Sequence, residues 1–215
     1  MIQGKVALQV LATTCAFAGV ALLPAPTAQR SGPLAPIASF VATVHWARAD
    51  AAFDEGRLDV GLARAERALA LDPAPSEGWS WLAGVLVHRF GAPEFEVNPA
   101  GRRAWVEAGL AVLARGESES REPEELAFHA GLIMAFVGSL PGDVLEWPGG
   151  ARSAWLEAAS HFERAERLGH PRAEEAAQAA MAEVHWPSPE PTWDPQEEGA
   201  KTEPLRLQHS HEDED

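Results

Sequence analysis

The sequence predicts an all-α protein built from repeated helical hairpins. Ala and Leu dominate the middle of the chain and long β-branched runs are absent, which favours helix over strand. The chain around Ala83 repeats the helix–turn–helix pattern found around Ala49, 34 residues earlier. A hairpin of two short helices cannot bury its own apolar face, so this repeat predicts stacked hairpins that present a surface to other molecules.

Size and charge limit the domain organisation and the partners of the chain. Its 215 residues fit one domain with appendages, and hydrophobic residues make up 46% of them, enough for a core. The net charge of -15 argues against nucleic acid as a partner, because a phosphate backbone requires a basic face. Residues 187–215 combine many acids with several prolines, so we expect a disordered acidic tail there.

The N-terminus has the features of an export or membrane signal. Lys5 precedes an uncharged apolar run, residues 6–23, which as a helix would span about 27 Å, just the thickness of a bilayer core. We predict that residues 1–23 form an uncleaved signal anchor that holds the chain to the membrane. A cleaved signal peptide, giving a secreted protein, and a buried soluble helix are the alternatives.

Charge around this run predicts its orientation. The amino group and Lys5 lie before the apolar residues, and Arg30 is the only nearby base after them. This places the N-terminus in the cytoplasm and the body on the periplasmic, or otherwise extracytoplasmic, side. Residues 24–36 are then a Pro-rich linker between the anchor and a helical domain at residues 37–186.

The first predicted hairpin runs from about residue 42 to residue 75. Its first helix contains Ala49 and Ala52 and stops at Gly56. Its second helix ends at the Asp72-Pro73 pair. Small and apolar residues at helical spacing would let the two helices approach closely, namely Gly61, Leu62, Ala65, Ala68, Leu69 and Leu71.

Two further hairpins and a final helix follow. The first helix of the second hairpin carries Trp79, Leu82, Ala83 and Leu86, and its second helix carries Ala104, Trp105, Ala108, Leu110 and Ala111. The third hairpin has Leu126, Ala130 and Ile133 in its first helix and Ala158, Phe162 and Ala165 in its second. A last helix, from Arg172 to about His185, would cap the open end of the stack.

These residues resemble the tetratricopeptide repeat (TPR) family, and the match is most specific in the segment ALALDPAP, residues 68–75. The resemblance covers residues 37–186 and implies an α-solenoid of about three hairpins with a capping helix. His45 and Arg48 depart from the pattern, because the family has large apolar residues at those places. A generic helical bundle is the alternative.

The resemblance also implies a concave groove lined by the first helices of the hairpins. Projection of the family's inward-facing positions onto this chain gives Trp46, Asp50, Phe53, Asp54, Glu77, Ser80, Val87, His88, Glu124 and Met134. This set contains no Lys or Arg, so it lacks the basic clamp with which chaperone-binding TPR domains hold a carboxylate. We therefore expect an amphipathic helix or a basic-apolar segment as ligand, with ordinary packing as the alternative for each residue.

Two insertions predict a second candidate surface. From the small residue of the first helix to that of the second, the hairpins span 12, 21 and 28 residues in turn. The extra residues fall in the same turn of their hairpins, at residues 90–103 and 138–152, so both should emerge on one rim. Aromatic and acidic residues there are the candidate binding residues: Glu94, Phe95, Glu96, Asp143, Glu146 and Trp147. Tolerated insertion is the alternative.

Motifs for catalysis are absent from the sequence. It contains no GxxxxGK[ST] loop, no HExxH, no nucleophile elbow and no CxxC. We predict a protein that is not an enzyme and has no cofactor and no metal site, although His209 and His211 in the acidic tail could bind a divalent metal loosely.

Together these features predict a non-catalytic scaffold or adaptor that binds other proteins through the groove or the rim loops. The anchor would tether it to a membrane with its body on the extracytoplasmic side. The alternative is a structural subunit of a larger membrane complex, held there by its N-terminal transmembrane helix.

Overall fold

The computed structural model describes residues 35–185 of the chain. Within this range every regular element is a helix and there is no strand, which confirms the all-α prediction. The predicted anchor, most of the predicted linker and the predicted acidic tail lie outside the described residues. None of the helices in residues 35–185 is both long and apolar enough to cross a membrane.

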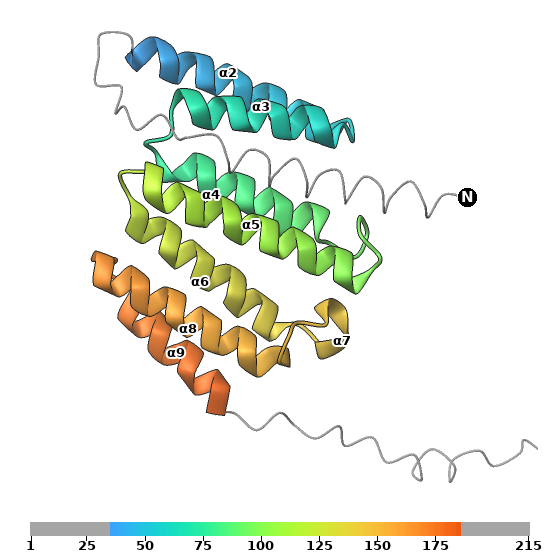
Figure 1. The fold of residues 1–215 in the computed structure, drawn as a ribbon, viewed down its shortest axis with the longest axis vertical. Helices are drawn as coiled ribbons and strands as arrows, with labels where there is room; N and C mark the ends of the chain where they lie inside the picture. The colour runs from blue at the N-terminus through green and yellow to red at the C-terminus, as the bar shows by residue number, and fades with distance from the viewer. Residues whose placement is uncertain (1–34, 186–215) are drawn as a thin grey trace, which may run out of the picture. The chain divides into compact units, whose positions relative to one another are not determined.

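The helices follow one another as antiparallel hairpins (Figure 1). The first hairpin consists of α2 (Ala35–Asp54) and α3 (Leu58–Leu71). The second consists of α4 (Ser76–Gly84), continued by the π-helical segment η1 (Val85–Phe90), and α5 (Pro99–Glu119). The third consists of α6 (Pro123–Ser139) and α8 (Gly150–Leu168), with the short α7 (Gly142–Leu145) between them, and α9 (Ala173–His185) follows.

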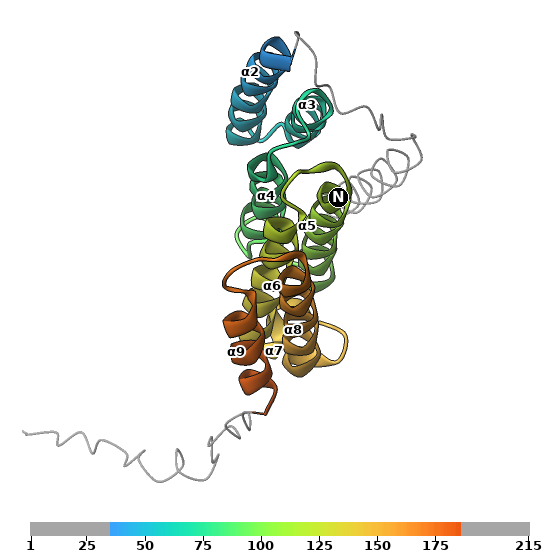
Figure 2. The ribbon, with the colours of Figure 1, turned by 90° about the vertical axis from the view of Figure 1, so that its left-hand side faces the viewer.

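The hairpins stack so that their helices form two columns (Figure 2). The first helices α2, α4 and α6 lie in one column, and the second helices α3, α5 and α8 lie in the other. Contacts between α3 and α4, and between α5 and α6, join each hairpin to the next. One face of residues 35–184 is therefore formed by the first helices, with α9 on the same side at the end of the stack.

Two glycines end helices, one of them at Gly56, where the sequence predicted a stop. Gly56 follows α2 with φ +72°, and Gly169 follows α8 with φ +101°. This left-handed backbone costs little for a residue without Cβ, and it turns the next N–H groups back onto the helix. Accordingly Arg57 N donates to Ala52 O at 2.8 Å, and His170 N donates to Ala165 O at 2.9 Å.

Each hairpin closes on a glycine that meets a large side chain of the partner helix. A Cβ on Gly61 of α3 would lie 2.3 Å from the Phe53 ring of α2. In the third hairpin, a Cβ on Gly131 of α6 would lie 2.5 Å from the Phe162 ring of α8. Because Phe53 and Phe162 are almost fully buried, the rings cannot move aside, and the backbones approach only because Cβ is missing.

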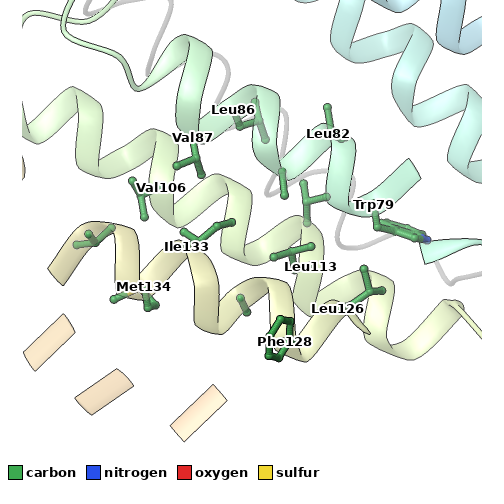
Figure 3. Close-up of a cluster of buried hydrophobic side chains, with 14 of the residues drawn as sticks. Trp79, Leu82, Leu86, Val87, Val106, Leu113, Leu126, Phe128, Ile133 and Met134 are labelled. Carbon is green, nitrogen blue, oxygen red and sulfur yellow. The ribbon is translucent and has the colours of Figure 1, made fainter. Parts of the chain in front are cut away.

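The hydrophobic core continues from one hairpin into the next (Figure 3). The buried residues Trp79, Leu82 and Leu86 of the second hairpin's first helix belong to the same cluster as Leu113 of α5 and Leu126 of α6. Part of the core lies between hairpins, since buried residues of α4, α5 and α6 belong to one cluster. Burial of apolar surface, at about 25 cal/mol per Å², therefore stabilises the single hairpins and also their stacking.

Polar contacts join the turn at residues 74–76 to the turn at residues 120–122. The Glu122 carboxylate accepts hydrogen bonds from Ser76 Oγ at 2.5 Å and from Ser76 N at 3.2 Å. Ala74 O accepts from Ser120 Oγ at 2.9 Å and from Arg121 N at 3.0 Å. The start of α4 thus has its free N–H capped by a carboxylate from the next hairpin.

Three boundaries differ from the sequence prediction. Helix α2 already includes Ala35 and Pro36, the last two residues of the predicted linker. Helix α5 begins at Pro99, inside the predicted insertion, because the Asn98 side chain caps it by accepting from Ala100 N at 3.0 Å. Helix α8 likewise begins at Gly150, two residues before the second predicted insertion ends.

The departure at Arg48 has a local explanation. Arg48 is exposed and α2 is the first helix of the described range, so a large apolar residue is not needed there. His45 is half-buried, and burial, followed by the charges of Arg64 and Arg67 of α3 and of Arg48, lowers its pKa. The departure at His45 has no such explanation.

The close approach in the third hairpin can be tested with Gly131→Ala. Its Cβ would overlap the Phe162 ring, so we expect about 1–3 kcal/mol of lost unfolding free energy, measured by urea denaturation of the full chain. The matched control is Gly84→Ala, whose Cβ would have no heavy atom within 4 Å. It should be neutral or stabilise by up to about 1 kcal/mol. An equal loss of unfolding free energy in Gly131→Ala and Gly84→Ala would contradict the close contact of Gly131 with the Phe162 ring.

The cap on α4 predicts a pH dependence. The hydrogen bond from the Ser76 hydroxyl, followed by that from the Ser76 N–H, holds the pKa of Glu122 below its ordinary value. Its stabilising effect is therefore complete above the unfolded pKa of about 4.3 and is lost as the pH falls below that. Glu122→Gln should lower the unfolding free energy by about 0.5–2 kcal/mol at pH 7. In urea titrations, the difference in unfolding free energy between the unmodified chain and Glu122→Gln should shrink toward pH 3. A difference that does not change with pH would show that the charge of Glu122 does not cap α4.

Candidate functional site

A pocket of about 500 Å³ lies between α2 and the start of α4, on the face formed by the first helices. Three predicted groove residues line it: Trp46, Asp50 and Glu77. The other lining residues are Ser39, Ala42, Thr43, Ala47, Asp72, Pro75, Gly78 and Trp81. Its volume falls within the range of small-ligand pockets, so it can take one or a few side chains of a bound segment.

Two indole rings form one side of this pocket. Trp46 of α2 and Trp81 of α4 meet edge to face, with ring centroids 5.2 Å apart and an interplanar angle of 73°. Both side chains are only partly buried. Trp81 also packs against the buried Phe53, at 6.0 Å between centroids, which holds its ring in place. The edge-to-face geometry leaves aromatic surface available to a ligand.

A glycine sets the depth of the pocket. A Cβ on Gly78 would lie 2.8 Å from the Trp46 ring, so a larger residue would displace that ring. The start of α4, which carries Gly78 and Glu77, is itself positioned by the Glu122 cap on Ser76. Local sequence and a contact from the next hairpin therefore both shape the pocket.

Three carboxylates surround the pocket, and they differ in their partners. Asp72 Oδ2 accepts a hydrogen bond from Ser39 Oγ at 2.5 Å. Asp50 and Glu77 are exposed, and in the described part of the chain they form no hydrogen bond or ion pair. Among the residues that line the pocket there is no Lys or Arg. Two negative charges thus remain without compensation beside the indoles.

Another predicted groove acid, Asp54, is compensated. Its Oδ1 pairs with Arg89 Nη1 at 2.9 Å, and Arg89 Nη2 also donates to Phe53 O at 2.8 Å. The ion pair closes the end of the face formed by α2 and η1, outside the pocket. Since both side chains of the pair are largely exposed, it contributes little to stability.

Three predicted groove residues belong to the core instead. Phe53, Val87 and Met134 are at most 2% exposed. Phe53 packs on Gly61, and Val87 approaches Gly109 of α5, where a Cβ would lie 2.7 Å from its methyl group. These side chains are buried in the core of the described residues. They therefore have a packing role, which was the alternative to groove binding, and they offer no free surface to a ligand.

The remaining groove candidates lie away from the pocket. His88 is exposed, and its ring packs on that of Phe136 of α6 with ring centroids 4.9 Å apart. The partial burial of the imidazole lowers the pKa of His88. Ser80 and Glu124 are half-buried, and neither lines the pocket. The structure therefore brings together Trp46, Asp50 and Glu77 but not these three.

The two predicted rim loops lie at the same end of their hairpins, as Figure 1 shows at the α4–α5 and α7 turns. Arg103 Nη1 donates to Glu146 O at 3.1 Å across them. Phe95 is 52% exposed and packs on Phe90, and Glu94 is exposed. The rim thus offers one exposed aromatic residue next to an acid.

The other rim candidates have structural roles or fall outside the description. Glu96 is buried and accepts a hydrogen bond from Asn98 N at 3.0 Å, which orders the start of α5. Trp147 is half-buried against the core. Glu146 is exposed and adopts a left-handed backbone with φ 49°. The side chain of Asp143 lies outside the described residues.

Groups for acid–base or metal chemistry do not gather at the pocket. Among residues 35–185 no group of three or more His, Cys, Asp or Glu is placed to hold a metal ion. Burial raises the pKa of Glu117 and lowers that of His161, but neither lines the pocket.

Sequence reasoning missed Ser39, Asp72 and Trp81. Ser39 was missed because the first helix is longer at its start than predicted. Asp72 was interpreted only as a helix stop. Trp81 lies two residues after the core residue Trp79, and a side chain two positions along a helix points to a different side. That spacing is the signal that could have found it.

No protein-family model matches this chain, and comparisons with curated proteins and with solved structures find no match. The residues and geometry described above are therefore the basis for assigning a function.

Asp50 and Glu77 have no hydrogen-bond or ion-pair partner among the described residues, so we predict that removing their charges leaves the stability of the fold almost unchanged. The variant Asp50→Asn with Glu77→Gln should unfold within about 0.5 kcal/mol of the unmodified chain, because exposed groups without partners contribute little. Urea denaturation measures this directly. A loss above about 1 kcal/mol would mean that these acids hold the fold.

Proposed function

We propose that this chain is a non-catalytic scaffold that binds other proteins, and that residues 37–186 form a TPR-type solenoid. The observation that carries the proposal is the open pocket on the face of the first helices, lined by Trp46, Asp50 and Glu77. Solenoids of helical hairpins use this face to hold partners. A surface with partly buried indoles and unpaired acids is poorly explained by stability alone.

Three features of the fold support the proposal of a TPR-type solenoid. The hairpins are stacked in two columns with shared cores. Glycines in the first and third hairpins pack against a phenylalanine of the partner helix, Gly61 of α3 on Phe53 and Gly131 of α6 on Phe162. Helix α9 packs after the last hairpin and exposes much of its outer surface, as expected of a capping helix.

We further propose that the scaffold is tethered to a membrane by residues 6–23, with its body on the extracytoplasmic side. The support for this part is the sequence alone, namely the uncharged apolar run after Lys5 and the proline-rich residues that follow. A tether would restrict the pocket to partners that come close to the membrane.

Site-specific photocrosslinking in the cells that produce the chain tests the proposal. A photoreactive amino acid at Glu77 should form adducts with one or a few discrete proteins, because Glu77 lines the pocket and is exposed. Adding Trp46→Ala should abolish those adducts, because it removes one indole of the pocket.

The matched control site for this experiment is Glu163. It is exposed on α8, in the other column, and does not line the pocket. The same adducts from Glu163, or adducts at Glu77 that persist with Trp46→Ala, would show that the first-helix face is not a binding surface.

A second candidate function, a structural subunit of a larger membrane complex, is favoured by one observation. Near the start of α2 three apolar side chains are exposed: Ile37 (59%), Phe40 (70%) and Val41 (36%). They stand close in sequence to the predicted anchor and would suit a fixed neighbour at the membrane.

Exchange of residues 6–23 for an unrelated anchor separates the two functions. A scaffold should keep its Glu77 adducts after the exchange, because its pocket is unchanged. A subunit held by its own membrane helix should drop out of the complex, as read by native gel electrophoresis of detergent extracts. If the chain stays in the complex after the exchange, the function as a structural subunit held by its own membrane helix is excluded.

A further inference from the structure

We propose that the pocket between α2 and α4 binds the guanidinium group of an arginine in a partner segment. This inference rests on the proposed scaffold function and assigns the chemistry of its ligand. Three properties of the pocket lead to it: the paired indoles, the uncompensated carboxylates and the size of the cavity.

The indole pair favours a flat cation. Trp46 and Trp81 are fixed at 5.2 Å between centroids and both line the pocket, so a ligand group that enters contacts aromatic surface. The face of an indole is electron-rich and attracts a cation, Trp more strongly than Phe. A guanidinium can also stack on it, because it is planar and weakly hydrated.

The carboxylates select against anions and favour a positive charge. Asp50 approaches from α2, and Glu77 approaches from the first turn of α4. The third acid, Asp72, already accepts from Ser39 Oγ, yet it keeps its negative charge. With no basic side chain in the lining, an arginine would supply the missing countercharge and could donate to both free acids.

The size of the pocket indicates that the arginine belongs to a larger segment. A volume of about 500 Å³ leaves room beside one side chain. The additional walls are small or apolar, from Ala42, Ala47 and Pro75. A segment that carries apolar residues next to its arginine would fill this space, whereas a free cation would leave the walls wet.

Fluorescence anisotropy with short labelled peptides tests the inference on the full chain in detergent. The probe is a peptide with one arginine flanked by leucine and alanine. Matched peptides carry citrulline, lysine or glutamate at that place. We expect the arginine peptide to bind about tenfold more tightly than the citrulline peptide, which keeps the shape and loses the charge. The glutamate peptide should not bind.

Two variants locate the effect in the pocket. Asp50→Asn with Glu77→Gln should reduce the affinity for the arginine peptide to that for the citrulline peptide. Glu163→Gln on α8 removes the same kind of exposed charge outside the pocket and should leave the affinity unchanged. Circular dichroism confirms that each variant is folded.

Defined results would overturn the inference. Equal affinity for the arginine and citrulline peptides would exclude recognition of the charge, and equal affinity for the lysine peptide would exclude the preference for a guanidinium. A loss of affinity in Glu163→Gln as large as that in the double variant would show a general charge effect. If Glu77 adducts form in cells while arginine is not preferred, the scaffold function stands and only its ligand chemistry is wrong.

Discussion

The described fold depends on helices that approach one another more closely than ordinary side chains permit. In the first and third hairpins a glycine lies under a phenylalanine ring, at Gly61 with Phe53 and at Gly131 with Phe162. This contact brings the two backbones of a hairpin together. The buried side chains of neighbouring hairpins also belong to one continuous cluster, so close packing within and between hairpins forms a single core.

The first helices carry both buried and exposed residues. Residues that meet a glycine of the partner helix are buried, as Phe53 and Val87 are. Trp46 and Asp50 lie seven and three residues before Phe53, on nearly the same side of α2, yet Trp46 is partly exposed and Asp50 is exposed. The pocket lies where α2 and α4 face each other across Gly78.

Local signals in the sequence predicted the helices well, and signals that depend on neighbouring helices predicted less. Gly56 ends its helix as expected, because a left-handed residue and its hydrogen bonds are properties of one short segment. The burial of Met134, Phe53 and Val87 was not predictable in this way. Whether a side chain faces a groove or the partner helix depends on how closely that partner approaches, which one helix alone does not encode.

The hydrogen bonds from Glu122 to Ser76 have a consequence for the pocket. They fix the first turn of α4, which also supplies Glu77 and Gly78 to the pocket wall, yet Glu122 belongs to the next hairpin. A ligand that requires this turn in place must also favour the docked position of the third hairpin, and by thermodynamic reciprocity that docking must strengthen ligand binding. Binding of such a ligand at the pocket would then be coupled in free energy to the docking of the third hairpin.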